Sequence, residues 1–201
     1  MPQSDMQEEK KSFRKRWALK SADLSMRCKE EAGKKMASHL FASAVYQNAL
    51  SLFIYISTDL EPDTHSIIEH AWKAGKSVYV PKCLGYGQME AVKIADWSSL
   101  APGRMGILEP KETMPSANKQ DFDLCLVPCV TVTRCGHRLG HGAGYYDRWL
   151  KNHGGTRICL CFESLIADCV PQDPWDVQMD GILTETGLCL FSTTQKGGKN
   201  Q

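Results

Sequence analysis

Residues 136–150, GHRLGHGAGYYDRWL, decide how the chain can be organised. They follow an apolar, strand-like run at 122–132 and lead into a segment with helical spacing. Three glycines alternate inside the stretch: Gly140, Gly142 and Gly144. Their backbone can approach a ligand closely and turn its amides toward an anion. A helix that begins near Tyr145 would add its positive dipole end at the same place. The stretch therefore predicts a phosphate-binding turn between a strand and a helix of an α/β protein.

Charged side chains in the same stretch favour a nucleotide triphosphate as the ligand. Arg138 supplies a fixed positive fork, and Asp147 supplies a carboxylate of the kind that binds Mg²⁺ together with phosphate oxygens. The pattern is neither GxxxxGK[ST] nor GxGxxG, and the glycines alone fit a plain structural turn equally well. The plain structural turn is a weaker interpretation because the same loop also contains Arg138, Asp147 and the tyrosine pair 145–146.

The string RLGHGAGYYDRWL resembles the signature of the 5-formyltetrahydrofolate cyclo-ligases, also called methenyltetrahydrofolate synthetases. DLCLVP precedes it and VQMDGILTE follows it. Further similar segments occur in the same order over nearly the whole chain: KKSFRKRW, SLFIYISTDLEPDT, SVYVPK and GILEP. The resemblance implies an enzyme that uses ATP and Mg²⁺ to convert 5-formyltetrahydrofolate to 5,10-methenyltetrahydrofolate, with release of ADP and phosphate.

Two alternatives remain open beside that activity. One is a non-catalytic module that binds a nucleotide or folate, and the other is a different phosphate-ligand enzyme on the same scaffold, since a fold does not fix a function. The basic first helix and the two aspartates Asp147 and Asp180 argue against both.

The resemblance also implies a set of site residues. ATP would contact the first helix and the glycine-rich turn through Lys10, Lys11, Arg14, Arg138, Leu139, Gly140, His141, Gly142, Ala143, Gly144, Tyr145 and Tyr146. The folate would contact Ile56, Glu61 and Tyr145, and Met89 is a candidate for the same pocket or for the core. Arg138 and Tyr145 are the expected catalytic residues, and Asp147 and Asp180 are the expected Mg²⁺ ligands.

Several of these residues have simpler explanations. The lysines and arginines of the first helix fit a solvated helix face, Tyr146 fits a core position, and Asp180 fits a cap at the end of an element. Some relatives carry basic residues where this chain has His141 and Ala143, so less fixed positive charge surrounds the phosphates here. A protonated His141 would compensate, because histidine changes its charge near neutral pH.

Composition limits the class of protein. The 201 residues carry a net charge of +1 with 23% charged side chains, which gives no general affinity for nucleic acid. The start is acidic and lacks the apolar core of a secretory signal, and no apolar run approaches the length of a membrane span. We expect one domain over residues 1–201 with a frayed tail at 195–201, no membrane partner, a cytoplasmic location and a monomer.

The nine cysteines are odd in number, form no CxxC pair and include several in apolar runs. Cys159 and Cys161 lie two apart in a strand-like segment, where they would fill space as small hydrophobic side chains. Buried reduced thiols in a reducing compartment are the expectation.

The remaining elements predict a three-layer α/β/α fold with a mostly parallel, Rossmann-like sheet. Helix formers occupy 7–20, and Ser21 or Ser25 can cap a second helix toward residue 45, so that 1–47 would form a helical hairpin packed on the α/β body. A helix capped by Asp63 or Thr64 follows the first strand and leads to the second. Strands are expected at 50–57, 77–80, 122–132 with a bend at Pro128, 156–162, 181–184 and 188–191.

Overall fold

The computed structural model describes residues 3–103, 107–117 and 121–191. The helices are α1 (Gln3–Ala22), α2 (Met26–Phe41), α3 (Ala44–Asn48), α4 (His65–Lys73) and α5 (Tyr145–Leu150), with short 3₁₀ turns η1 (Trp97–Ser99) and η3 (Glu163–Leu165). The strands are β1 (Ser51–Ile54), β2 (Ser77–Gly85), β3 (Gln88–Ile94), β4 (Leu100–Pro102), β5 (Leu108–Pro110), β6 (Asp121–Pro128), β7 (Thr131–Val132), β8 (Arg138–Leu139), β9 (Gly154–Leu160), β10 (Gly181–Thr184) and β11 (Gly187–Leu190). The expected tail at 195–201 lies outside the described residues.

A central sheet has the order β11-β10-β9-β6-β1-β2-β3. The five strands from β10 to β2 in this order run parallel, and β11 and β3 pair antiparallel at the two edges. The α/β class and the mostly parallel sheet are therefore confirmed. The segment QMEAVKI, for which no strand was predicted, is β3 and forms a hairpin with β2.

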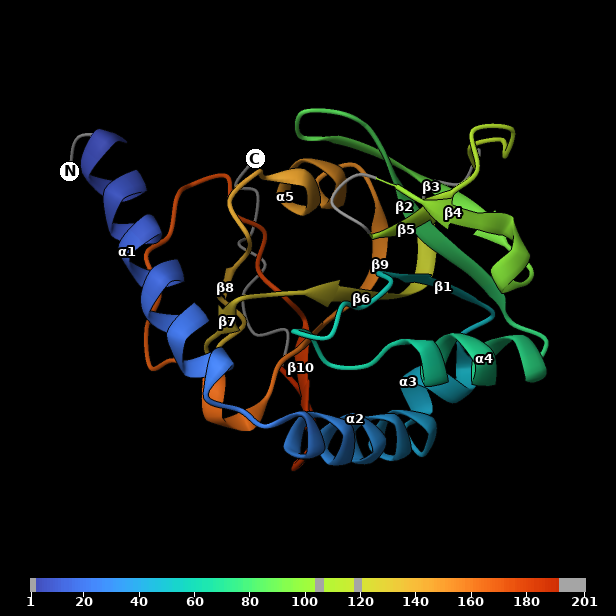
Figure 1. The fold of residues 1–201 in the computed structure, drawn as a ribbon, viewed down its shortest axis with the longest axis horizontal. Coiled ribbons are helices and arrows are strands. Elements are labelled where there is room, and N and C mark those ends of the chain that lie inside the picture. The colour runs from blue at the N-terminus through green and yellow to red at the C-terminus, as the bar shows by residue number, and fades with distance from the viewer. Residues whose placement is uncertain (1–2, 104–106, 118–120, 192–201) are drawn as a thin grey trace, which may run out of the picture.

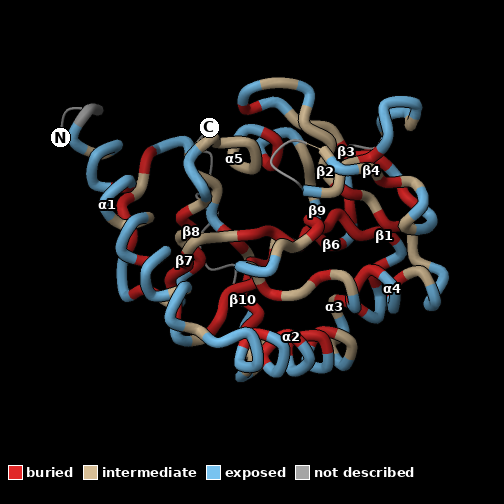
Figure 2. The backbone as a smooth tube through the Cα atoms, in the orientation of Figure 1, coloured by how far each residue is buried: buried red, intermediate tan, exposed pale blue. Residues whose placement is uncertain are grey.

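Helices cover both faces of the sheet. Figure 1 shows α2, α3 and α4 on one side and α5 on the opposite side. Phe53 of β1 stacks on Trp149 of α5 with 3.9 Å between ring centroids, and both rings pack near Phe122 of β6. On the side of α2, Met36 and Leu40 are fully buried. The strands form the buried centre of the molecule in Figure 2, as expected for a three-layer protein.

The first two helices are present, but they do not form the expected hairpin. Ser25, rather than Ser21, caps α2 by accepting a hydrogen bond from the Cys28 N–H. The helix α2 packs on β10 and β11, whereas α1 stands at a steep angle to it and packs on η3 (Figure 1). Trp17 of α1 donates from Nε1 to the Leu165 carbonyl at 2.7 Å. The helix α1 is thus fixed beside the sheet edge that holds the glycine-rich turn.

Pro128 ends β6, as its missing N–H predicts. The chain then enters a two-stranded ribbon in which β7 pairs with β8, and Val130 donates its N–H to the Leu139 carbonyl at 2.8 Å. The glycine-rich turn follows β8 directly and leads into α5. The bend at Pro128 therefore sets the turn beyond the carboxyl end of β6.

The cysteines only partly match the expectation of buried thiols. Cys125, Cys159 and Cys161 are buried, and Cys129 is half-buried. Four others are exposed: Cys28, Cys135, Cys169 and Cys189. None of the helices in the described part of the chain is long and apolar enough to cross a membrane.

Asp63 caps α4, although Thr64 occupies the formal capping position. Its carboxylate accepts hydrogen bonds from the His65 N–H, the Ser66 N–H and the Ser66 hydroxyl. The hydrogen bond between the His65 imidazole Nδ1 and Asp63 Oδ1, at 3.1 Å, is the largest cause that holds the pKa of Asp63 well below its usual value, and these contacts add to it.

We expect Asp63→Ala to lower the free energy of unfolding by about 1 kcal/mol at neutral pH. The pKa of Asp63 is lower in the folded state than in the unfolded state. The resulting stabilisation is therefore complete above the unfolded-state pKa of about 3.9 and is lost as the pH falls below that value. The difference between wild type and variant should therefore shrink below about pH 4. Urea unfolding at several pH values measures it, with the exposed Asp59→Ala as control, and a difference independent of pH would contradict the capping role.

Candidate active site

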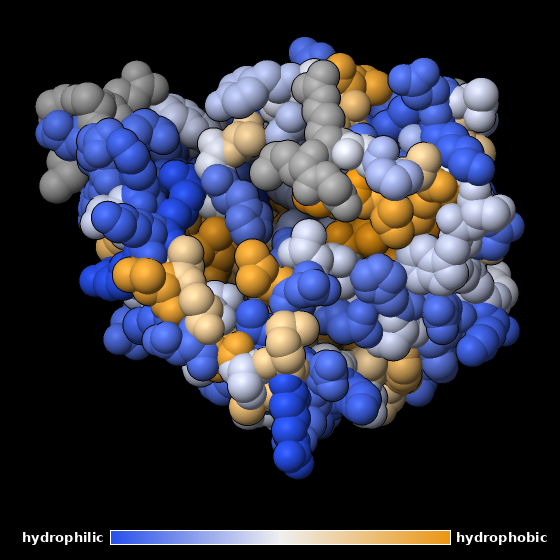
Figure 3. Space-filling view, viewed as in Figure 1, coloured by the Kyte–Doolittle hydropathy of each residue, from blue (hydrophilic) through white to orange (hydrophobic). Residues whose placement is uncertain are grey.

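A cleft of about 1320 Å³ opens at the carboxyl edge of the parallel sheet. Residues at or just after the ends of β1, β6 and β9 line it, namely Tyr55, Pro128 and Leu160. Figure 3 shows a hollow beside the polar surface of α1, with hydrophobic residues in its floor. Ligands bind at this edge in open α/β sheets.

Most of the predicted site residues line this cleft. From α1 and the glycine-rich turn they are Lys10, Arg14, Arg138, Leu139, Gly140, His141, Gly142, Ala143, Gly144, Tyr145, Tyr146 and Asp147. Ile56, Glu61 and Met89 line it as well. Two predicted residues do not: Lys11 is exposed with its Nζ 3.6 Å from Glu8 Oε1, and Asp180 lies outside the lining. Lys11 therefore lies on the solvated face of the first helix, which was the simpler explanation for its charge.

Arg138 and Asp147 form a buried ion pair at the centre of the cleft. The Arg138 Nη2 donates to Asp147 Oδ2 at 2.8 Å, and its Nη1 donates to the Pro128 carbonyl at 3.1 Å. Burial lowers the pKa of Arg138, but Asp147 and the other groups around the guanidinium together outweigh this effect, so the pKa lies above its usual value and the guanidinium stays charged. Its Nε is buried without a hydrogen-bond partner among the described residues. The site therefore holds a fixed cation with an unused donor.

Arg14 reaches from α1 to the glycine-rich turn. Its Nε donates to the Gly140 carbonyl at 2.8 Å. A Cβ at Gly142 would lie 3.2 Å from the Arg14 guanidinium carbon, and φ at Gly142 is +109°, so this position suits glycine. The absence of a side chain at Gly142 lets the guanidinium approach the turn.

Lys10 is buried between two carboxylates that the sequence analysis did not single out. Its Nζ lies 2.7 Å from Asp173 Oδ2 and also bonds Asp176 Oδ2. Gln7 donates to Asp173 at 3.1 Å, and the Asp173 N–H donates to Asp176 at 2.8 Å. The sole sequence signal was PQDPWD, two aspartates in a segment that contains two prolines.

Glu61 lines the same cleft and lies close to the glycine-rich turn at His141. Its Oε2 accepts from the N–H and the hydroxyl of Thr58, both at 3.0 Å, and His141 Nε2 lies 3.6 Å from Oε1. Burial raises the pKa of Glu61, but the contacts with His141 and Thr58 outweigh it, so the pKa lies below its usual value. The carboxylate is therefore charged, and it lines the cleft with Oε1 beside His141. His141 contacts this carboxylate, whereas the sequence suggested a role beside the phosphates.

The two tyrosines of the turn differ in their surroundings. Tyr145 lines the cleft and is half-buried. Tyr146 lies near Phe53, with 6.3 Å between ring centroids, and the guanidinium carbon of Arg138 lies 5.8 Å from its ring centroid. Burial raises the pKa of the Tyr146 phenol far above its usual value. Tyr146 thus contacts both the core and the cleft.

The cleft can supply part of a magnesium site. Asp147 accepts from Arg138 with one oxygen and from the Val177 N–H with the other at 3.2 Å. Asp180 Oδ2 accepts from the Arg157 N–H at 2.9 Å, so its carboxylate caps the start of β10 in this structure. In residues 3–103, 107–117 and 121–191, no group of three or more His, Cys, Asp or Glu side chains is placed to hold a metal. Magnesium commonly uses one or two protein carboxylates and takes its other ligands from phosphates and water. The residues therefore fit a metal that binds Asp147 together with a nucleotide.

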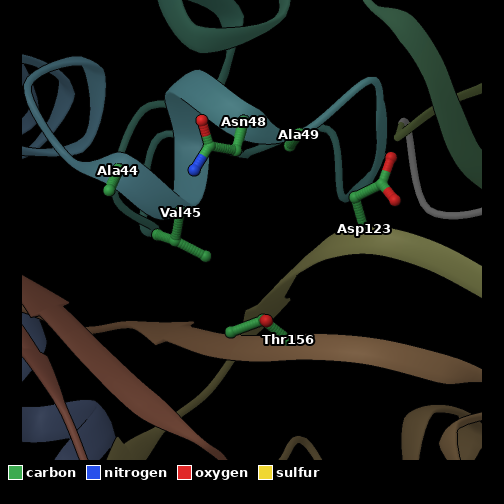
Figure 4. A pocket seen from close by; sticks show the side chains of 6 residues that line it. All are labelled: Ala44, Val45, Asn48, Ala49, Asp123 and Thr156. Atoms are coloured by element: carbon green, nitrogen blue, oxygen red, sulfur yellow. The ribbon is translucent and has the colours of Figure 1, made fainter.

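A second, smaller pocket of about 350 Å³ lies at the opposite edge of the sheet (Figure 4). Val45 and other residues at the start of α3 and after it face Asp123 of β6 and Thr156 of β9 across it. The Asp123 carboxylate accepts hydrogen bonds from the Leu50 and Ser51 N–H groups and the Ser51 hydroxyl. This carboxylate holds the start of β1, so we place the functional site in the larger cleft.

The class that emerges is an α/β protein with a candidate phosphate-binding turn that follows β8 and leads into α5. Comparison with known proteins makes the class specific. The family model described as "5-formyltetrahydrofolate cyclo-ligase family" matches residues 6–185, and the chain belongs to that family.

Individual relatives agree with this membership. A protein named "Probable 5-formyltetrahydrofolate cyclo-ligase" from Caenorhabditis elegans is 30% identical over 77% of this chain and 82% of its own length. The 5-formyltetrahydrofolate cyclo-ligase of Escherichia coli K12 is 29% identical over 77% and 88%. The NMR structure of Aquifex aeolicus 5,10-methenyltetrahydrofolate synthetase is 26% identical, with a TM-score of 0.82 over 94% of this chain and 96% of that one.

Proposed function

We propose that this protein catalyses the ATP-dependent cyclisation of 5-formyltetrahydrofolate to 5,10-methenyltetrahydrofolate, with release of ADP and phosphate. The observation that carries the proposal is one cleft whose lining has two parts, Arg14 and Arg138 beside the glycine-rich turn and the charged carboxylate of Glu61. The first part suits phosphates and the second suits the N–H groups of a pterin ring. Two different ligands can therefore meet in one cavity.

The chemistry explains why ATP is consumed. Ring closure requires N10 to attack the N5-formyl carbon and to expel its oxygen, and an oxide is a very poor leaving group. Transfer of the γ-phosphoryl group to that oxygen converts it to phosphate, which leaves readily. The protein mainly positions two substrates and neutralises charge, as phosphoryl-transfer sites generally do.

The roles of the residues follow from their positions. The glycine-rich turn, Gly140 to Gly144, surrounds the triphosphate, and Arg138 and Arg14 neutralise charge that develops on the transferred group. Glu61 orients the pterin through its Oε1, while Thr58 fixes the other oxygen. Tyr145 packs on one of the two substrates from the start of α5.

Magnesium would neutralise charge on the phosphates and orient them when bound. We assign its protein ligand to Asp147, whose carboxylate lines the cleft. Asp180 would have to leave the Arg157 N–H to reach the same metal, so its role as a second ligand stays a prediction. The cytoplasmic location and the monomeric state also stay predictions.

The test is the absorbance of the methenyl product, followed with purified protein, 5-formyltetrahydrofolate, ATP and Mg²⁺. We expect formation of product that requires both ATP and the metal, and a loss of about 10²-fold or more in kcat for Asp147→Asn. Asp180→Asn, measured in parallel, shows whether the second carboxylate contributes. No product from a protein that still binds the folate would overturn the proposed activity.

A further inference from the structure

Arg148 joins two segments that border the two halves of the cleft. Its Nε donates to the Gly87 carbonyl at 2.8 Å, and its Nη2 donates to the Ala143 carbonyl. Gly87 lies at the tip of the β2–β3 hairpin, and Ala143 lies in the glycine-rich turn. Figure 1 shows this hairpin tip lying near α5, and β3 contacts α5 directly. One guanidinium therefore connects segments about sixty residues apart in the chain.

The backbone at both ends leaves room for this guanidinium. A Cβ at Gly87 would overlap the Arg148 guanidinium, and a Cβ at Gly144 would lie 3.1 Å from its Nη1. Both glycines also have positive φ, +71° and +68°, where other residues are strained. The hairpin tip and the turn thus approach Arg148 more closely than side chains would allow.

The two segments belong to different ligands under the proposed function. The hairpin contributes Cys83, Tyr86 and Met89 to the cleft, and Met89 is a candidate for the folate pocket. The glycine-rich turn borders the phosphates. Ala143 brings no charge of its own, so Arg148 also places a fixed cation at this turn.

We propose that Arg148 is a positioning residue that clamps the β2–β3 hairpin to the glycine-rich turn and thereby couples folate binding to nucleotide binding. The inference rests on the proposed function. Because Arg148 bonds both segments, a ligand that orders one segment also orders the other before its own ligand arrives. Such coupling is reciprocal, because each ligand changes the affinity for the other by the same factor.

The test is the dissociation constant of 5-formyltetrahydrofolate with and without a non-hydrolysable Mg·ATP analogue. In the wild type we expect the analogue to tighten folate binding by about 5-fold or more. We call the dissociation constant without the analogue, divided by that with it, the coupling ratio. In Arg148→Ala the coupling ratio should fall to about one. Arg148→Lys should behave similarly, because an ammonium is a compact point charge without the planar fork of donors. Arg27→Ala, which removes an exposed arginine of α2, should keep the wild-type ratio.

A second variant tests the clamp without changing Arg148. Asparagine tolerates positive φ, but in Gly87→Asn its side chain would occupy the place of the guanidinium, so the coupling ratio should again fall to about one. A coupling ratio of one in the wild type would overturn the inference. So would a coupling ratio equal to that of the wild type in either Arg148→Ala or Gly87→Asn. Absence of turnover in the wild type would instead count against the proposed function, so the two failures can be told apart.

Discussion

Arg138→Ala should reduce kcat/KM for cyclisation by about 10³-fold or more, because an arginine on the transferred phosphoryl group contributes on that order. It should also lower the free energy of unfolding by about 3–5 kcal/mol, the usual cost of removing one partner of a buried pair. The guanidinium is 5% exposed, and its loss leaves Asp147 charged inside the cleft. Steady-state kinetics and denaturant unfolding measure the two effects separately.

Two further variants separate catalysis from stability at this site. Arg138→Ala combined with Asp147→Asn should recover part of the unfolding free energy, since no unpaired charge remains, but it should recover no activity. Arg138→Lys keeps the charge and loses the fork that reaches both Asp147 and the Pro128 carbonyl, so we expect an intermediate rate. An Arg138→Ala variant with near-normal kcat/KM would remove Arg138 from the chemistry.

Lys10→Met should have the second-largest effect. The side chain is 4% exposed, and its ammonium neutralises Asp173 and Asp176 together. Methionine preserves most of the packing but leaves two adjacent carboxylates without their cation. We expect a loss of about 3–5 kcal/mol in the free energy of unfolding and a marked rise in the KM for ATP.

The matched control adds Asp173→Asn and Asp176→Asn to Lys10→Met. This triple variant carries no unpaired charge, so its unfolding free energy should return toward that of the wild type. If Lys10 also binds phosphate, the KM for ATP stays high in the triple variant. A normal KM there would mean that Lys10 only fastens α1 to the segment that carries Asp173 and Asp176.

Much of the fold follows from local signals in the sequence. Apolar runs bounded by turn residues predicted the strands of the parallel sheet. Pro128 predicted the end of β6 because it lacks an N–H donor. The antiparallel strand β3 was missed, since its pairing with β2 depends on a hairpin whose turn has no strong signature.

The features of the site likewise fall into those that neighbouring residues predict and those that depend on distant contacts. Glycine spacing and one arginine within residues 136–150 were sufficient to predict the phosphate-binding turn, because these features act over a few neighbouring residues. The sequence could not show that Lys10 meets Asp173 and Asp176, which lie more than 160 residues away.

Two further contacts between residues far apart in the chain could not be predicted from the sequence. His141 contacts Glu61, 80 residues away in the chain, and Asp180 bonds the backbone of Arg157 on the neighbouring strand. A charged side chain finds its partner only after distant segments pack, and the ionic groups of one sequence allow many pairings. The sequence by itself determined the α/β sheet, the family and the glycine-rich turn to which we assign phosphate binding. The tertiary structure decided which charges are paired, which are buried, and which remain available to a substrate.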